Sequence, residues 1–219
     1  MTAYDRSHTK LWGFDMVTST ERATKARGDK YALRRRMLAE AALVTLAEHG
    51  FANTGLRDIA QHSALSHGSL HYYFEDKNDL VAESVWLYKS RCARRYEPIL
   101  ETATDADDFV ARIADAMAAT LRDDASMHRL WYDLRNQALF DEGFRDTIIR
   151  IDQLLQQMVW SIVQRHADLV GRTPCIEPEP AYALVDGLFQ HALIRFLRGE
   201  RGAVDRLRRE CAALLPQLA

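Results

Sequence analysis

Apolar residues along most of this chain recur every three or four positions, the spacing of one face of an α-helix. The first clear example runs from Tyr31 to His49, and the face it presents contains Met37, Leu38, Ala41, Ala42 and Leu46. Gly50 follows, and a glycine is a common end to a helix. Since no segment shows the strict alternation of a half-buried strand, the sequence predicts an all-α protein.

Three helices are expected next, each opened by a residue whose side chain can cap the free N–H groups of the first turn. The caps are Thr54, Ser66 and Asp76, and Asp79 lies three residues after the last of them, as in a capping box. The expected ranges, with the cap as first residue, are 54–62, 66–73 and 76–98. A tight turn, Ser63-Ala64-Leu65, separates the first two.

Longer helices are expected beyond residue 100, over 105–122, 126–139, 144–166 and 181–198, and a last one reaches about residue 215. The third carries apolar residues three, four, three and four positions apart, a pattern typical of a helix–helix seam. They are Ile148, Ile151, Leu155, Met158 and Ile162. The sequence therefore predicts a mobile tail over 1–28, a three-helix domain over 29–77 and a larger helical domain over 78–219.

Charge is distributed unevenly although the net charge is only −2. Residues 22–36 hold seven basic residues and one acid, Asp29, whereas residues 81–219 hold 18 basic and 21 acidic ones. This asymmetry favours contact with a polyanion at the N-terminal end only, the alternative being a solvated basic tail. The three cysteines are odd in number and far apart in sequence, which argues against a disulfide framework and favours a reducing cytoplasm. The lack of an apolar run of about 20 residues predicts a soluble protein without a membrane partner.

The segment 54–73 has the organisation of a helix-turn-helix. The major groove of DNA is about 12 Å wide and admits one α-helix. A recognition helix must therefore be short, capped, and polar on its outer face. Residues 66–73 meet this description, with Leu70 directed inward alongside Leu65 and Phe74. Gly68 omits a side chain where the start of the helix would approach the duplex.

The stretch GLRDIAQHSALSHGSLHYYFEDKNDL, residues 55–80, resembles the signature of the TetR family of transcription regulators, and the preceding helix with Gly50-Phe51 is similar as well. Three positions depart from it: Ala64 stands where the turn usually has glycine, His67 where lysine is frequent and His71 where tyrosine is frequent. The resemblance implies a set of DNA-contacting residues, namely Thr54, Ser66, His67, Gly68, Ser69, His71, Tyr72, Tyr73 and Lys77.

The resemblance also implies a homodimer on a palindromic operator in double-stranded DNA, which a small-molecule effector of unknown identity releases. The expected dimer interface comprises Ile148, Ile151, Leu155, Met158, Ile162, Leu184, Leu188 and Ala192. An effector pocket is expected among apolar walls with a few polar groups. Its expected lining is Trp86, Phe109, Met117, Trp131, Tyr132, Arg135 and Phe140. We expect no metal and no cofactor besides the effector.

Several alternatives stay open at this point. His67 and His71 are four residues apart, which is also the spacing of a metal-binding pair. Tyr72 and Tyr73 could be core aromatics, and Lys77 an ordinary solvated lysine. The chain lacks the common catalytic motifs, so an enzyme is not expected, although Cys175 with His166 or His191 could form a thiol–imidazole pair. A ligand-binding or interaction protein that has lost operator binding is the rival function.

Overall fold

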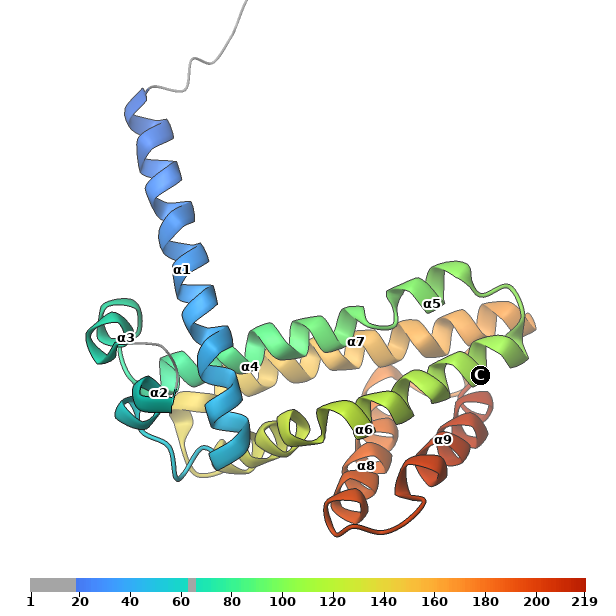
Figure 1. Ribbon diagram of the computed structural model, residues 1–219. Coiled ribbons are helices and arrows are strands. Elements are labelled where there is room, and N and C mark those ends of the chain that lie inside the picture. Colours follow the sequence, from blue (N-terminus) through green and yellow to red (C-terminus); the bar gives the residue numbers. More distant parts are fainter. Residues whose placement is uncertain (1–18, 63–65) are drawn as a thin grey trace, which may run out of the picture. The chain divides into compact units, whose positions relative to one another are not determined.

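The computed structural model describes residues 19–62 and 66–219, and within those ranges every regular element is a helix (Figure 1). The predicted all-α class is thereby confirmed. The side chains of residues 19–26, 62 and 67 fall outside the description. The first 18 residues of the tail predicted over residues 1–28 and the turn Ser63-Ala64-Leu65 also lie outside the described residues.

The first helix, α1 (Ser19–His49), begins twelve residues before the expected start at Tyr31. The tail predicted over residues 1–28 is therefore wrong for residues 19–28. This segment is rich in alanine, arginine and lysine, which favour helix by propensity, but it has no apolar face for periodicity to detect. The chain divides into two compact units after Arg34. The domain boundary expected after residue 77 stays a prediction.

The helix-turn-helix consists of the second half of α1 with α2 (Leu56–His62) and α3 (His67–Tyr73). Leu38, Ala42 and Leu46 of α1 are buried, as are Leu70 and Phe74 at the end of the segment. These residues confirm the predicted inner face, with one exception. Met37 is 50% exposed, so it lies at the edge of the apolar stripe and not within it.

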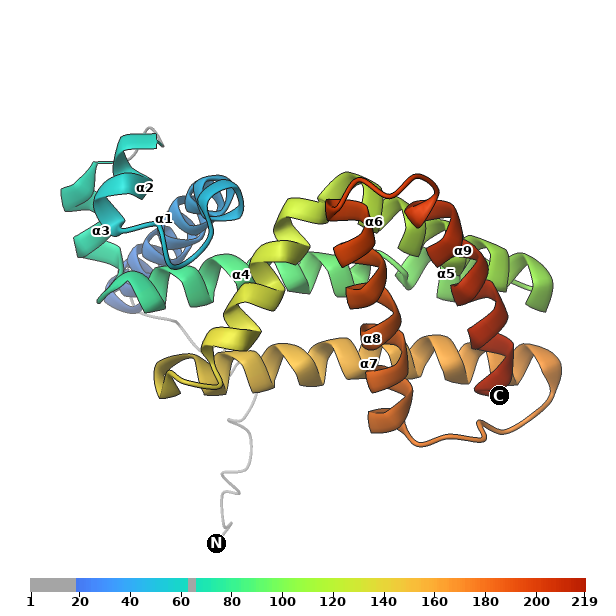
Figure 2. The same ribbon diagram turned by 90° about the horizontal axis from the view of Figure 1, so that it is seen from below.

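The remaining chain forms a larger helical body. Its elements are α4 (Lys77–Arg94), α5 (Glu97–Thr102), α6 (Ala106–Gln137), η1 (Glu142–Phe144), α7 (Arg145–Val170), α8 (Pro178–Leu197), α9 (Ala203–Leu214) and η2 (Leu215–Gln217). α4 and α7 lie side by side over much of their length in both views (Figures 1 and 2). α8 packs against α6, α7 and α9, and α9 packs against α6, so the body encloses a continuous apolar core.

Two helix boundaries differ from the prediction for identifiable reasons. α4 ends at Arg94, and Pro98 lies in the first turn of α5, where a missing N–H costs nothing. The helices expected over 105–122 and 126–139 form a single helix, α6, with a kink at Asp124, whose φ of −120° and ψ of 20° are not helical.

The seam on α7 requires a correction. Ile148, Ile151, Leu155 and Ile162 are buried within their own chain, and Met158 is half-buried beside a cavity. Ala192 on α8 is also buried, whereas Leu184 is 48% exposed and Leu188 half-buried. Side chains inside the core cannot meet a second copy, so of the expected dimer residues only Leu184 presents a large exposed apolar surface. The apolar spacing correctly identified the buried face of α7, but it could not show whether the same chain or a second copy covers that face.

Candidate functional site

The recognition helix α3 is short, capped and exposed on its outer side. The Ser66 hydroxyl accepts a hydrogen bond from Ser69 N at 3.1 Å and also lies 2.7 Å from the Ser69 hydroxyl. Leu70 is fully buried, while His71 is exposed and Tyr72 is 70% exposed. Tyr73 is half-buried, and its ring meets that of Tyr72 edge-on at 4.8 Å. A helix with one inward leucine and an outward polar and aromatic face has the form a major groove accepts.

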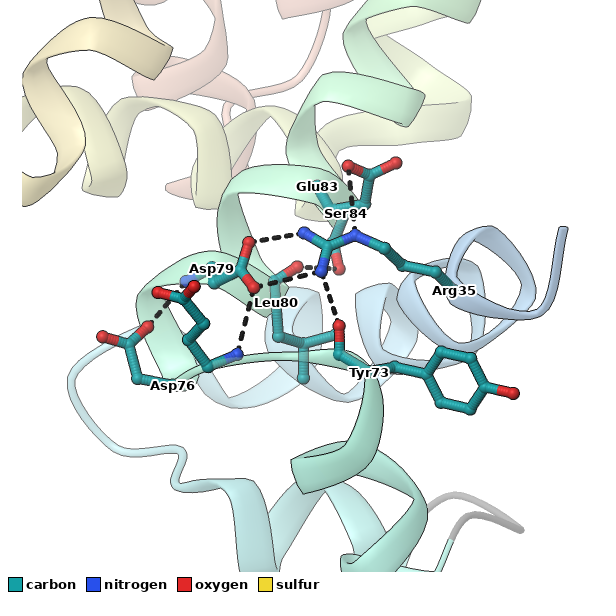
Figure 3. Close-up of polar contacts among 8 residues, drawn as sticks. Arg35, Tyr73, Asp76, Asp79, Leu80, Glu83 and Ser84 are labelled. Atoms are coloured by element: carbon teal, nitrogen blue, oxygen red, sulfur yellow. Dashed lines mark hydrogen bonds and ion pairs between the residues drawn. The ribbon is translucent and has the colours of Figure 1, made fainter. Parts of the chain in front are cut away.

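Arg35 ties the end of α3 to both neighbouring helices (Figure 3). Its Nη1 donates to the carbonyl oxygen of Tyr73 at 2.5 Å, and its two terminal nitrogens form a bidentate pair with Asp79 at 2.5 and 3.1 Å. The guanidinium also stacks 4.5 Å from the centre of the Phe74 ring. We call these four residues, Arg35, Tyr73, Phe74 and Asp79, the Arg35 cluster. It joins α1, the exit from α3 and the first turn of α4.

The carboxylate of Asp79 is held in its charged form by this cluster. Burial acts to raise the pKa of Asp79, but hydrogen bonds from Arg35 and from the Glu75 N–H outweigh it, and the pKa lies below its ordinary value. Asp76 caps α4 by accepting from Asp79 N at 2.8 Å. The predicted capping residues Ser66 and Asp76 are both confirmed as caps.

Two of the residues expected to contact DNA, Thr54 and Lys77, are directed into the protein. Thr54 is 1% exposed and donates from Oγ1 to Gly50 O at 2.7 Å, so it neither caps α2 nor presents its hydroxyl to DNA. Asp58 instead accepts from Gly55 N at 2.7 Å. Lys77 is half-buried, donates to Phe51 O at 2.5 Å and lies 3.7 Å from the Phe51 ring centre. Burial lowers the pKa of Lys77, against the opposing charges of Asp133 and Asp58.

A cavity opens in the larger body between α4, α6, α7 and α8. Its volume is about 60 Å³, or about 510 Å³ when the surrounding space open to solvent is counted. Its polar lining includes Lys89, His128 and Asp186, and its apolar lining includes Met117 and Phe189. A second cavity adjoins it and is lined almost entirely by apolar side chains. Its volume is about 30 Å³, or about 420 Å³ with the space open to solvent, and both linings share Tyr96, Met117, Met158, Val159 and Val185.

Asp186 and Asp152 form a polar network at one wall of the first cavity. Asp186 accepts from Tyr132 Oη at 2.9 Å and from Arg135 Nη1 at 2.5 Å. Asp152 accepts from Tyr182 Oη at 2.6 Å and lies 3.6 Å from Arg135 Nη2. Burial is the largest cause raising the pKa of Tyr132 and of Tyr182 far above the usual range, so both phenols stay protonated donors.

The predicted pocket residues fall into two groups. Met117 and Tyr132 line the first cavity, Arg135 binds its Asp186, and Trp131 lies fully buried with its ring centre 4.9 Å from Lys89 Nζ. The other three line neither cavity: Trp86 stacks under Arg150, Phe109 stacks on His166, and Phe140 is 88% exposed.

The sequence interpretation missed Lys89 and His128, which are 3% and 6% exposed. A signal for Lys89 existed, because it shares a helical face with Val85, Cys92 and Tyr96, all of which are buried. A charged residue on an otherwise apolar helical face is costly to bury and marks a candidate site.

The proposed thiol–imidazole pair does not form in the described part of the chain, because Cys175 is exposed and its Sγ donates to Gln217 O at 3.1 Å. None of the described helices has the length and apolar character needed to cross a membrane.

Comparison with known proteins agrees with this architecture. Residues 38–84 match the family described as bacterial regulatory proteins, tetR family. The chain is 27% identical to the HTH-type transcriptional regulator PksA of Bacillus subtilis over 186 residues, 80% of this chain and 85% of PksA. It is 36% identical to the HTH-type transcriptional repressor KstR2 of Mycolicibacterium smegmatis over 73 residues, 33% of this chain and 36% of KstR2.

Solved structures share the fold across most of the chain. A TetR transcription regulator from Haloarcula marismortui aligns with a TM-score of 0.69 at 18% identity, over 85% of this chain and 98% of that one. The regulator FadR from Bacillus subtilis, solved in complex with stearoyl-CoA, aligns with a TM-score of 0.67 at 16% identity, over 81% of this chain and 95% of that one.

The fold and the helix-turn-helix define a DNA-binding transcription regulator. The helix-turn-helix segment, residues 38–84, belongs to the TetR family of bacterial regulatory proteins, and the chain as a whole shares the fold of solved TetR regulators.

Proposed function

We propose that this protein is a homodimeric repressor that binds a palindromic operator and is released from it by a small-molecule effector. The observation that carries the proposal is the outward face of α3, where His71 and Tyr72 are exposed above buried Leu70. The Arg35 cluster fixes the C-terminal end of that helix. A fixed, exposed, capped helix is what groove recognition requires.

A dimer is proposed because one recognition helix reads few base pairs. Two half-sites about 34–36 Å apart supply the missing specificity. The outer faces of α7 and α8 offer the surface: Ile149 is 54%, Leu184 48% and Ile194 60% exposed. Exposed apolar residues on two packed helices favour a protein contact.

Effector release would act through a shift between two conformations. The cavity supports this, as do two relatives of similar fold, because FadR was solved with stearoyl-CoA and a regulator from Saccharomonospora viridis with choline. α4 begins at the Arg35 cluster and also carries Lys89 in the cavity wall. An effector that prefers one position of α4 would change the spacing of the two recognition helices.

Removing the outward side chains of α3 tests the proposal. In Tyr72→Ala and His71→Ala, we expect the affinity for a palindrome upstream of the protein's own gene to fall about tenfold or more, since each lost contact to DNA costs about 1–3 kcal/mol. Fluorescence anisotropy with labelled duplex measures this. Wild-type affinity should also fall steeply with salt, because phosphate contacts release counterions.

Val170→Ala is the control, because Val170 is an exposed apolar residue at the far end of α7. It should bind like wild type. If neither variant of α3 changes the affinity, or wild type binds no upstream duplex, the rival function without operator binding is the correct one.

Gly68 allows stability and DNA binding to be separated. A Cβ built at this position meets no atom within 4 Å among the described residues beyond its own helix, so Gly68→Ala should keep or raise the free energy of unfolding, by up to about 1 kcal/mol from helix propensity. If the backbone approaches the duplex here, operator affinity should nevertheless fall. Urea unfolding and anisotropy on the same preparation check both parts. Unchanged affinity would show that the duplex does not approach Gly68.

A further inference from the structure

The first cavity contains an ammonium group without a carboxylate partner. Lys89 is 3% exposed, and its Nζ lies 3.3 Å from His128 Nδ1. Its other close neighbours are aromatic, with the Trp131 ring centre at 4.9 Å and that of Tyr88 at 5.8 Å. Within residues 27–61 and 68–219, no carboxylate lies at ion-pair distance from Lys89. Burying a charge without such a partner is costly.

The acidic residues nearby already have donors of their own. Asp186 accepts hydrogen bonds from Arg135 and Tyr132. Asp152 accepts a hydrogen bond from Tyr182 and forms an ion pair with Arg135. Their charges favour the ammonium form of Lys89 from a distance without contacting it. The ammonium group of Lys89 is therefore available to contact an anionic group of a ligand that enters the cavity.

His128 lies beside this ammonium group. Burial, followed by the charges of Lys89 and Arg95, lowers the pKa of His128 well below its ordinary value, so the ring is neutral. Its Nδ1 faces the Lys89 ammonium, which can only donate. The ring proton therefore belongs on Nε2, which is buried and has no hydrogen-bond partner in the described part of the chain. The imidazole thus accepts one of the three ammonium N–H donors of Lys89, and the other two are left for an acceptor that enters the cavity.

The adjoining cavity is suited to a hydrocarbon. Ile113, Ile162, Val163, Leu188 and Leu214 line it, together with the residues that both cavities share. A ligand with its polar end at Lys89 would extend from a polar wall into an aliphatic one. Because a cavity with a polar wall adjoins an aliphatic cavity, the pair suits an amphipathic ligand.

We propose that the effector is an organic monoacid, with its carboxylate bound by Lys89 and its apolar body in the aliphatic cavity. This inference rests on the proposed function, since it names the class of the effector. A monoanion fits better than a phosphate ester, because only one cation here is without a carboxylate partner and a phosphate would bring up to two charges.

The test compares ligands that differ only at the polar end. Straight-chain acids from butanoate to dodecanoate, with the matching alcohols, amides and trimethylammonium salts, are titrated into the protein at pH 7 by isothermal calorimetry, without DNA. We expect at least one acid to bind at least tenfold more tightly than its alcohol and its amide. In Lys89→Met that preference should disappear, so that the acid and the alcohol bind alike.

Arg94→Met is the matched control, because Arg94 is an exposed cation on the same helix. It should retain the preference for the acid. His128→Asn should reduce the preference only partly, because the ammonium remains. Circular dichroism of each variant confirms that the helical content is unchanged, and alcohol binding by Lys89→Met shows that its cavity is intact.

The affinity for the acid should also depend on pH. Burial lowers the pKa of Lys89 to about 8, so above that pH the empty site loses its positive charge and acid binding should weaken progressively. The groups that face Lys89 are Tyr88 and Cys92 on α4, His128, Tyr132 and Arg135 on α6, Asp152 on α7, and Tyr182 and Asp186 on α8. In Lys89→Met, the affinity for the acid should not decline between pH 7 and 9. This result would assign the decline in wild type to Lys89.

Tighter binding of a trimethylammonium salt than of the acid would overturn the proposal. So would equal affinity for acid and alcohol in wild type, or no binding by any acid. The operator experiment fails independently of these titrations: acid binding without operator binding would leave the effector class standing and remove the repressor function. Operator binding without acid binding would do the reverse.

Discussion

A chain carrying both Leu184→Glu and Ile194→Glu is expected to be monomeric and to bind its operator roughly 100-fold more weakly than wild type, because the second half-site contact is lost. Leu184 is 48% and Ile194 60% exposed on α8, so both substitutions are tolerated by the isolated fold. In a dimer they would bury carboxylates against an apolar partner surface, which is strongly unfavourable. Light scattering after size exclusion measures the mass, and anisotropy measures the operator affinity.

Leu139→Glu controls for the added charge, because Leu139 is 71% exposed in the loop after α6 and lies outside the proposed interface. It should remain dimeric. A dimeric double variant would place the interface elsewhere, and a monomeric one with full operator affinity would remove the need for a dimer. Ile151→Ala gives the contrasting result, since Ile151 is fully buried: stability should fall by about 2–5 kcal/mol while the dimer persists.

Replacing Phe74 by alanine should lower the free energy of unfolding by about 3–5 kcal/mol, the usual cost of emptying a buried aromatic site. Phe74 is 2% exposed and supports the guanidinium of Arg35, so the substitution also loosens the Arg35 cluster. Operator affinity should fall with stability. Urea unfolding followed by circular dichroism provides the measurement.

Tyr72→Ala, two residues earlier, should leave stability within about 0.5 kcal/mol of wild type because the side chain is 70% exposed. The pair therefore separates a structural aromatic from one available to DNA. If Phe74→Ala proved as stable as Tyr72→Ala, the inward direction assigned to Phe74 would be wrong.

The helix-turn-helix could be predicted from sequence because its determinants are local. Ser66 and Asp76 cap their helices through bonds to residues three positions away, and Leu70 and Phe74 are inward by helical spacing alone. Thr54 shows the limit. A threonine before a helix is a typical cap, yet here the hydroxyl turns back to Gly50 O, and Asp58 takes its place.

The effector site could be predicted only in part, because it is assembled from four helices. Tyr132 and Met117 were predicted as pocket residues because they are aromatic or apolar, and both line the first cavity. Phe140 was predicted for the same reason, yet it lies on the surface. Lys89 and His128 are 39 residues apart in sequence and meet only through packing of α4 on α6. The spacing of residues along one helix cannot predict a contact with a residue on another helix.

The continuity of α4 has a thermodynamic consequence. Asp79 and Lys89 belong to one uninterrupted helix, and at 1.5 Å per residue the ten positions between them span about 15 Å. If occupation of the cavity weakens operator binding by some factor, operator binding must weaken occupation of the cavity by the same factor. Protein already seated on its operator should then be harder to saturate with effector than protein free in solution, so the concentration that induces transcription would exceed the dissociation constant measured without DNA.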